Sequence, residues 1–143
     1  MQIINDLKQG KPLTDEQVIS LVYKRIQFYD CQNNGWVLDG LPQNKRQAEL
    51  LNRKGIVPTA VFSLNLTDMD IKKKILKAGS KEYEFDLEVV HERLEKNKKP
   101  LAEIEFYYES KYNNLMVLNA SLSKWGLFET ARKFIQTRTK SLK

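Results

Sequence analysis

Three short apolar segments alternate with longer amphipathic segments along this chain, and the alternation constrains the fold more than any other feature. The apolar segments cover residues 36–38, 60–66 and 115–119. A short continuous apolar run is typical of a strand that is covered on both faces. Strands that alternate with helices predict an α/β fold, with a three-layer, mostly parallel sheet flanked by helices.

The first expected helices are bounded by recognisable caps. Thr14 and Gln17 form a Thr-x-x-Gln capping box, which predicts a helix over residues 15–29. Residues 30–35 are polar, end in Asn-Gly and predict a loop. Asn44 can cap a second helix that continues to Lys54, just before a glycine that can end it.

Three further helices are expected in the second half of the chain. Thr67 or Asp68 should cap a helix that ends near residue 79. Residues 84–108 predict a helix with a break or kink at Pro100. Ser123 should open the last helix.

The length and composition predict one globular domain over residues 1–143. Domains of about 100 to 150 residues are the most common size. Hydrophobic residues make up 41% of the chain and charged residues 29%, which are ordinary values for globular proteins. No apolar run approaches the roughly 20 residues of a membrane span, and residues 1–10 do not resemble a signal peptide. We therefore expect a cytoplasmic protein that makes no membrane contact.

The net charge, the single cysteine and the single histidine limit which ligands the chain is expected to bind. The net charge of +6 favours anionic partners, but the lysines are dispersed, so we expect a solvated basic surface and no specific nucleic-acid binding. Cys31 is the single cysteine, which excludes an internal disulfide and a cysteine-built zinc site. His91 is the single histidine and stands beside Glu92, so we expect a solvated histidine and no metal site.

The segment GWVLDGLPQNKRQAELL, residues 35–51, carries the strongest functional signal. Its turn, residues 39–43, follows an expected strand, and open parallel sheets bind ligands beyond the carboxyl ends of their strands. Glycine allows a close backbone approach, proline fixes the turn, and Asp39 can hold a metal-bound water or a basic partner. A tight strand-to-helix turn with a capping aspartate is the alternative interpretation.

This segment resembles the Gly-Phe-Leu-Leu-Asp-Gly-Phe-Pro-Arg stretch of adenylate kinases and related nucleoside monophosphate kinases, which is followed by Gln-Ala. The neighbouring segments are similar in the same order: GKPLTDEQVISLVYKRI, GIVPTAVFSLNLTD, VHERL, LMVLNAS and FETARKFI. The resemblance covers nearly the whole chain from about Gly10 and implies a P-loop NTPase-like fold.

The resemblance implies roles for residues that match the family. Gln47 corresponds to the glutamine that contacts the adenine of the acceptor AMP, where an amide can both donate and accept. Asp39 corresponds to the aspartate near the metal, and Arg93 to a lid arginine that contacts the transferred phosphoryl group; these two are the candidate catalytic residues. A solvent-facing glutamine and a surface arginine are the alternatives. The other candidate substrate-binding residues are Pro12, Leu13, Gly40, Leu41 and Gln43.

Several positions depart from the family pattern. Gln43 replaces the arginine that binds the AMP phosphate, and a neutral amide cannot form that charged fork. Lys45 and Arg46 lie further along the helix and are not assumed to substitute. Lys74, the candidate cofactor-binding residue, replaces the arginine that stacks on the donor adenine, although lysine lacks a planar face. The lid is shortened to residues 79–85.

The phosphate-binding loop of the family is absent from this sequence. The six glycines include no Gly-x-x-x-x-Gly-Lys arrangement, so Mg²⁺ and ATP are expected as cofactors only if the loop is supplied elsewhere. The first family strand, which lies between the strands expected at residues 36–38 and 60–66, is also missing. We expect those two strands to pair directly, or a protein partner or second copy to fill the position.

Two functions follow from the resemblance. The first is a catalytically inactive module, a pseudoenzyme that serves as an AMP-binding remnant or as a protein-interaction and scaffold domain, with a nuclear or ciliary location also open. The alternative is a fragment or isoform of an active nucleoside monophosphate kinase that transfers a phosphoryl group from ATP to AMP. A nucleic-acid or acidic-surface binder is supported only by the charge.

Overall fold

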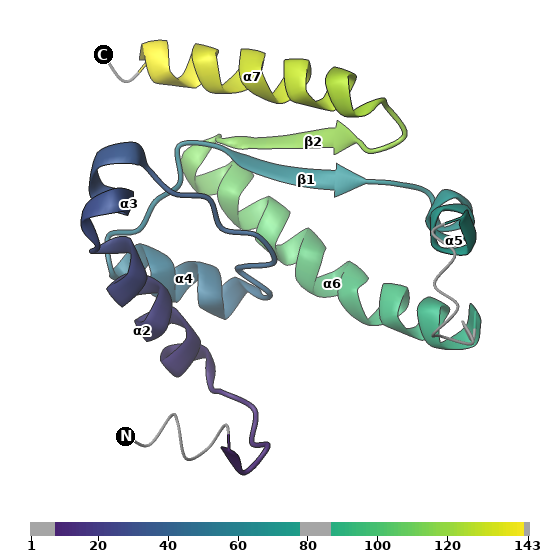
Figure 1. Cartoon of the computed structure of the whole chain (residues 1–143), viewed down its shortest axis with the longest axis horizontal. Coiled ribbons are helices and arrows are strands. Elements are labelled where there is room, and N and C mark those ends of the chain that lie inside the picture. Colours follow the sequence, from purple (N-terminus) through teal and green to yellow (C-terminus); the bar gives the residue numbers. More distant parts are fainter. Residues whose placement is uncertain (1–7, 78–86, 142–143) are drawn as a thin grey trace. The chain divides into compact units, whose positions relative to one another are not determined.

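The computed structural model describes residues 8–77 and 87–141, and its elements are labelled in Figure 1. Contacts divide the chain into two compact units, Met1–Val57 and Pro58–Lys143, and each unit is described by itself. The single-domain organisation stays a prediction. No helix among the described residues is long and apolar enough to cross a membrane.

The first unit begins with helix α2, Asp15–Ile26, which starts at the expected capping box. The backbone N–H of Thr14 donates to Oε1 of Gln17 at 2.9 Å, and the backbone N–H of Gln17 donates to Oγ1 of Thr14 at 3.3 Å. Two donors that the first helical turn leaves free are thereby satisfied. The prediction of this helix start is confirmed.

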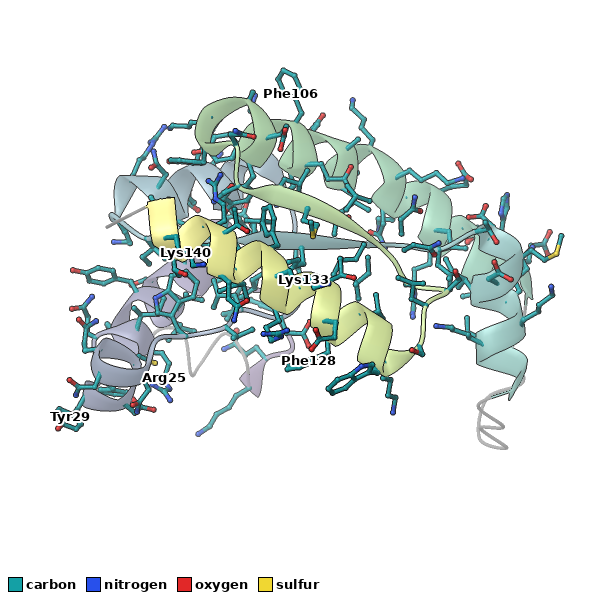
Figure 2. The ribbon with its side chains drawn as sticks, turned by 90° about the horizontal axis from the view of Figure 1, so that it is seen from above. Arg25, Tyr29, Phe106, Phe128, Lys133 and Lys140 are labelled. Atoms are coloured by element: carbon teal, nitrogen blue, oxygen red, sulfur yellow. The ribbon has the colours of Figure 1, made fainter. Side chains whose placement is uncertain are left out.

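The helix ends three residues earlier than expected, and the loop predicted at residues 30–35 is wrong. Phe28 adopts an extended backbone, and a short helix α3, Tyr29–Asn34, follows. The guanidinium of Arg25 donates to both carboxylate oxygens of Asp30, at 2.9 and 2.6 Å, across this break. Figure 2 shows Arg25 and Tyr29 at this end of the unit. Polar composition alone predicted a loop here, whereas local side-chain bonding supports a helical turn.

The core of the first unit forms between α2 and helix α4, Lys45–Arg53. Its buried side chains are Ile19, Ile26, Leu51 and Ile56. Partly buried apolar side chains surround them: Val22, Trp36, Leu38 and Leu50. Apolar residues from one stripe of each helix thus provide the burial that stabilises this unit.

The strand predicted at residues 36–38 does not form among the described residues. Trp36 and Leu38 pack against the core of the first unit, but Val37 between them is 92% exposed. The segment is extended and covered on one side only, with no ladder partner. The apolar run predicted a strand that is buried on both faces. In the folded unit, only alternate residues of the run are covered.

The second unit contains a parallel two-stranded sheet, β1 (Val61–Asn65) and β2 (Leu115–Asn119), as Figure 1 shows. Phe62 contacts Phe134 of α7 (Lys124–Ser141), with ring centroids 5.8 Å apart. The next residue, Ser63, donates a hydrogen bond to Glu105 of α6 (Leu87–Tyr112). Successive side chains of a strand point to opposite faces, so α7 and α6 cover opposite faces of the sheet.

This layering is compatible with the predicted α/β class, although the described sheet has two strands. Helix α5, Asp68–Lys77, begins where the sequence indicated, since Thr67 Oγ1 accepts from the backbone N–H of Asp70. The predicted break at Pro100 is wrong, because α6 continues through it. The lid remnant predicted at residues 79–85 lies outside the described residues.

A tyrosine cluster on α6 anchors the helix in the second unit. Tyr107 and Tyr108 are buried, with their ring centroids 5.3 Å apart. Burial raises the pKa of Tyr108 to about 12, because a phenolate would lose its hydration there. Tyr107 and Tyr112 add to this effect, since a negative charge on either would oppose a second one.

The raised pKa of Tyr108 predicts a loss of stability at high pH. A tyrosine in the unfolded chain ionises near pH 10, whereas the folded Tyr108 keeps its proton up to about pH 12. Stability is therefore fully present below pH 10 and falls by about 2 to 3 kcal/mol as the pH rises through this window. Urea denaturation from pH 9 to 12 should show a flatter profile for Tyr108→Phe. If the free energy of unfolding fell equally steeply with pH in both proteins, the prediction would be contradicted.

Candidate functional site

The turn predicted to carry the site, residues 39–43, precedes α4 in the first unit. Gly40 has φ of 71°, a left-handed conformation that side chains rarely adopt, which explains why a glycine stands there. Asp39 is exposed and makes no hydrogen bond or ion pair with any described residue. Leu41 is half-buried and Gln43 is exposed. The turn thus has the backbone shape that the sequence predicted, with its acidic side chain in solvent.

Gln47 lies at the centre of a polar network beneath this turn. Its side-chain amide is 3% exposed, so the alternative of a solvent-facing glutamine is wrong. Oε1 accepts from the backbone N–H of Gln43 at 2.7 Å, and Nε2 donates to Oδ1 of Asp15 at 2.7 Å. Both ends of the amide are engaged within the protein.

Asp15 and Asn44 complete the network. The Asn44 side chain caps α4 by accepting from the backbone N–H of Gln47 at 2.8 Å, and it donates to both Asp15 oxygens at 3.4 Å. Asn44 was expected as a helix cap, whereas Asp15 was not expected at the site. Asp15 and Gln47 are 32 positions apart, so no local pattern links them.

The segment before α2 borders this network through Thr14. Pro12 is exposed and Leu13 is half-buried, and both precede the capping box in extended backbone. The structure therefore brings Asp15 and Gln47 together, and it places Pro12 and Leu13 just before the helix that carries Asp15.

The charges near the turn are paired or exposed. Arg46 forms an ion pair with Glu16 of α2, which holds the pKa of that carboxyl below its ordinary value. Lys45 is exposed at the start of α4. Gln43 is neutral, and Arg46, the arginine nearest to it in sequence, is already paired. A phosphate there would meet backbone N–H groups and flexible ammonium groups instead of a guanidinium fork.

A second candidate region lies in the other unit, at the carboxyl ends of β1 and β2. It is an open depression of about 380 Å³. Its lining residues are Asn65, Leu66, Thr67, Asp70, Val117, Asn119 and Ser121. Carboxyl ends of parallel strands are where α/β sheets bind ligands. The carboxyl ends of the strands expected at residues 60–66 and 115–119 were the signal that could have indicated Asn65 and Asn119.

Lys74 and Arg93, the residues predicted for the donor nucleotide, lie in this second unit. Lys74 Nζ donates to the backbone oxygen of Ala120, in the turn after β2, at 2.9 Å. This places its ammonium near the depression, because Ser121 lines it. Arg93 is exposed on α6 and makes no hydrogen bond or ion pair with a described residue. Their nucleotide-binding roles stay predictions.

The network predicts that Gln47 stabilises the first unit. Gln47→Ala removes the acceptor of the Gln43 N–H and a donor to Asp15, which should lower the free energy of unfolding by about 1 to 3 kcal/mol. Lys45→Ala, two residues earlier and exposed, should change it by less than about 0.5 kcal/mol. Urea denaturation of the three proteins measures both values. Equal transition midpoints for Gln47→Ala and the unmodified chain would contradict this role.

The chain is similar to curated adenylate kinases over part of their length. It is 27% identical to mouse (Mus musculus) adenylate kinase 9, over 96% of this chain and 8% of that protein. It is 26% identical to adenylate kinase 8 of Xenopus tropicalis, over 94% of this chain and 31% of that protein. It is 39% identical to an adenylate kinase of the bacterium Photorhabdus laumondii, over 49% of this chain and 32% of that protein.

No model of a known protein family matches the chain. The matches to the curated relatives nevertheless include animal and bacterial adenylate kinases, and two of them extend over nearly the whole chain. This chain spans less than a third of the length of each of these relatives. The resemblance seen in residues 35–51 is thereby confirmed: the chain is similar to animal and bacterial adenylate kinases over part of their length.

Proposed function

We propose that this chain, as it stands, is an adenylate kinase-like module that does not transfer phosphoryl groups by itself and acts as a protein-interaction domain. One observation carries the proposal. Gln47, the residue assigned to the AMP adenine, is buried and gives both ends of its amide to Gln43 and Asp15. A base could use this amide only by replacing two hydrogen bonds that already stabilise the unit.

The charges around the turn support the absence of catalysis. Phosphoryl transfer depends on positioning the phosphates and stabilising their charge with cations. Gln43 is neutral, and Arg46 is paired with Glu16. The 143 residues hold no Gly-x-x-x-x-Gly-Lys sequence. The described residues beside the turn therefore offer no free guanidinium for the acceptor phosphate, and the sequence lacks the loop that would bind the donor phosphates.

Exposed apolar groups in the second unit support the interaction role. Trp125 and Phe128 of α7 are 70% and 54% exposed, and their ring centroids are 5.6 Å apart. Phe106 of α6 is also largely exposed, and Figure 2 shows it projecting away from that helix. Aromatic side chains are enriched at protein interfaces. The edge of β1 opposite β2 has no partner among the described strands and could accept another strand.

AMP binding is the second candidate function. It is favoured by the shape of the turn, where Gly40 keeps a left-handed conformation and Gln47 lies directly beneath the Gln43 backbone. Full kinase activity, with the phosphate-binding loop supplied by another part of a longer protein, is compatible with relatives named adenylate kinase that extend well beyond this chain. AMP, ATP and Mg²⁺ would be the ligands in that case.

A coupled assay with AMP, ATP and Mg²⁺ tests catalysis directly. We expect ADP formation by the purified chain to equal that of a protein-free control, because no phosphate-binding loop is present in it. A bacterial adenylate kinase serves as the positive control. ADP formation that scales with the concentration of this chain, and is lost in Arg93→Ala, would overturn the proposal.

Calorimetric titration with AMP separates the two candidate functions. For the interaction module we expect no heat of binding up to millimolar AMP. Binding that Gln47→Ala abolishes and that Lys24→Ala, an exposed change in the last turn of α2, leaves unchanged would instead support the AMP-binding function. Titration with a bisubstrate analogue that joins two adenosines through phosphates extends the same comparison to the donor side.

A further inference from the structure

Three side chains of the second unit bring metal-ligand atoms together, and none of the three lines the depression described above. They are Asp68 at the start of α5 and His91 and Glu95 on α6. One ligand atom from each lies within 4.8 Å of the other two. The three side chains are accessible from solvent, with Asp68 half-buried and the other two exposed. An ion could therefore reach them without rearrangement of the core.

The positions follow from helix geometry and from helix packing. His91 and Glu95 are four residues apart on α6, so their side chains lie on the same face, one turn from each other. Asp68 follows the cap residue Thr67 and is brought to this face because α5 packs against α6. The spacing of His91 and Glu95 was a signal in the sequence, whereas Asp68 is reached only through tertiary structure.

A positive charge already lies between the two carboxylates. Lys98 Nζ is 3.5 Å from Oδ2 of Asp68, and it also forms an ion pair with Glu95. The site thus attracts a cation, and a metal ion would compete with this ammonium for the same oxygens.

The ligand types indicate which ion would bind. Zn²⁺ accepts imidazole nitrogen together with carboxylate oxygen, whereas Mg²⁺ and Ca²⁺ prefer oxygen ligands alone. Three protein ligands leave a fourth tetrahedral position for water. The expectation that His91 has no metal role rested on its lack of a ligand neighbour, and this arrangement supplies two.

We propose that Asp68, His91 and Glu95 form a binding site for Zn²⁺ that joins α5 to α6. The site is separate from the turn that precedes α4 and does not depend on the proposed function. When Zn²⁺ binds, Lys98 leaves the two carboxylates and moves into solvent. Binding should raise the thermal unfolding temperature, because the ion binds the folded arrangement of the two helices in preference to the unfolded chain.

The test is calorimetric titration of the metal-free chain with Zn²⁺, and with Mg²⁺ as the comparison ion. All proteins carry Cys31→Ser, which removes the single thiol and leaves His91 as the single imidazole. We expect one Zn²⁺ per chain, and binding that is about tenfold weaker or worse for His91→Ala and for Asp68→Asn, since each removes a ligand. Glu92→Gln, adjacent to His91 and outside the cluster, should bind Zn²⁺ like the parent.

Lys98→Met tests the site independently, because it should change the Zn²⁺ affinity in the opposite direction to the ligand variants. Removing the competing ammonium should tighten Zn²⁺ binding while the three ligands stay in place, and the addition of His91→Ala should reverse the gain. The visible spectrum of bound Co²⁺ should change in His91→Ala if the imidazole is a ligand. Absence of Zn²⁺ binding, or equal affinity in the parent and His91→Ala, would overturn the proposal.

Discussion

The first unit depends on the hydrogen bond between Gln47 and Asp15. This contact joins two helices through residues 32 positions apart, and it supports the turn before α4 by placing the Gln47 oxygen against the Gln43 backbone. A buried amide needs partners for both its donor and its acceptor. Because Asp15 and Gln43 provide those partners, the network holds together without a ligand.

These internal bonds distinguish the shape of the turn from the nucleotide-binding role that the resemblance implies for it. Gly40 has a left-handed conformation and Gln47 is buried behind the turn, and the position for which the resemblance implies an arginine is the neutral Gln43. Arg46, the nearest guanidinium in sequence, pairs with Glu16. These residues therefore stabilise the first unit through hydrogen bonds and an ion pair made within the chain.

Sequence patterns predicted the second unit better than the first. The expected strands at residues 60–66 and 115–119 correspond to β1 and β2, because apolar runs bounded by turn residues suit a sheet with helices on both faces. The run at residues 36–38 had the same composition, but Val37 is exposed and no ladder forms. Local composition could not indicate whether a neighbouring strand was present to pair with it.

The sequence by itself determined the caps of α2 and α4, the strands β1 and β2 and the resemblance to adenylate kinases. These depend on residues close together along the chain, where short-range hydrogen bonds and hydrophobic periodicity act. Only the tertiary structure decided that Asp15 bonds to Gln47 and that Asp68 lies beside His91. Contacts between distant segments depend on how helices pack, and no local pattern records that geometry.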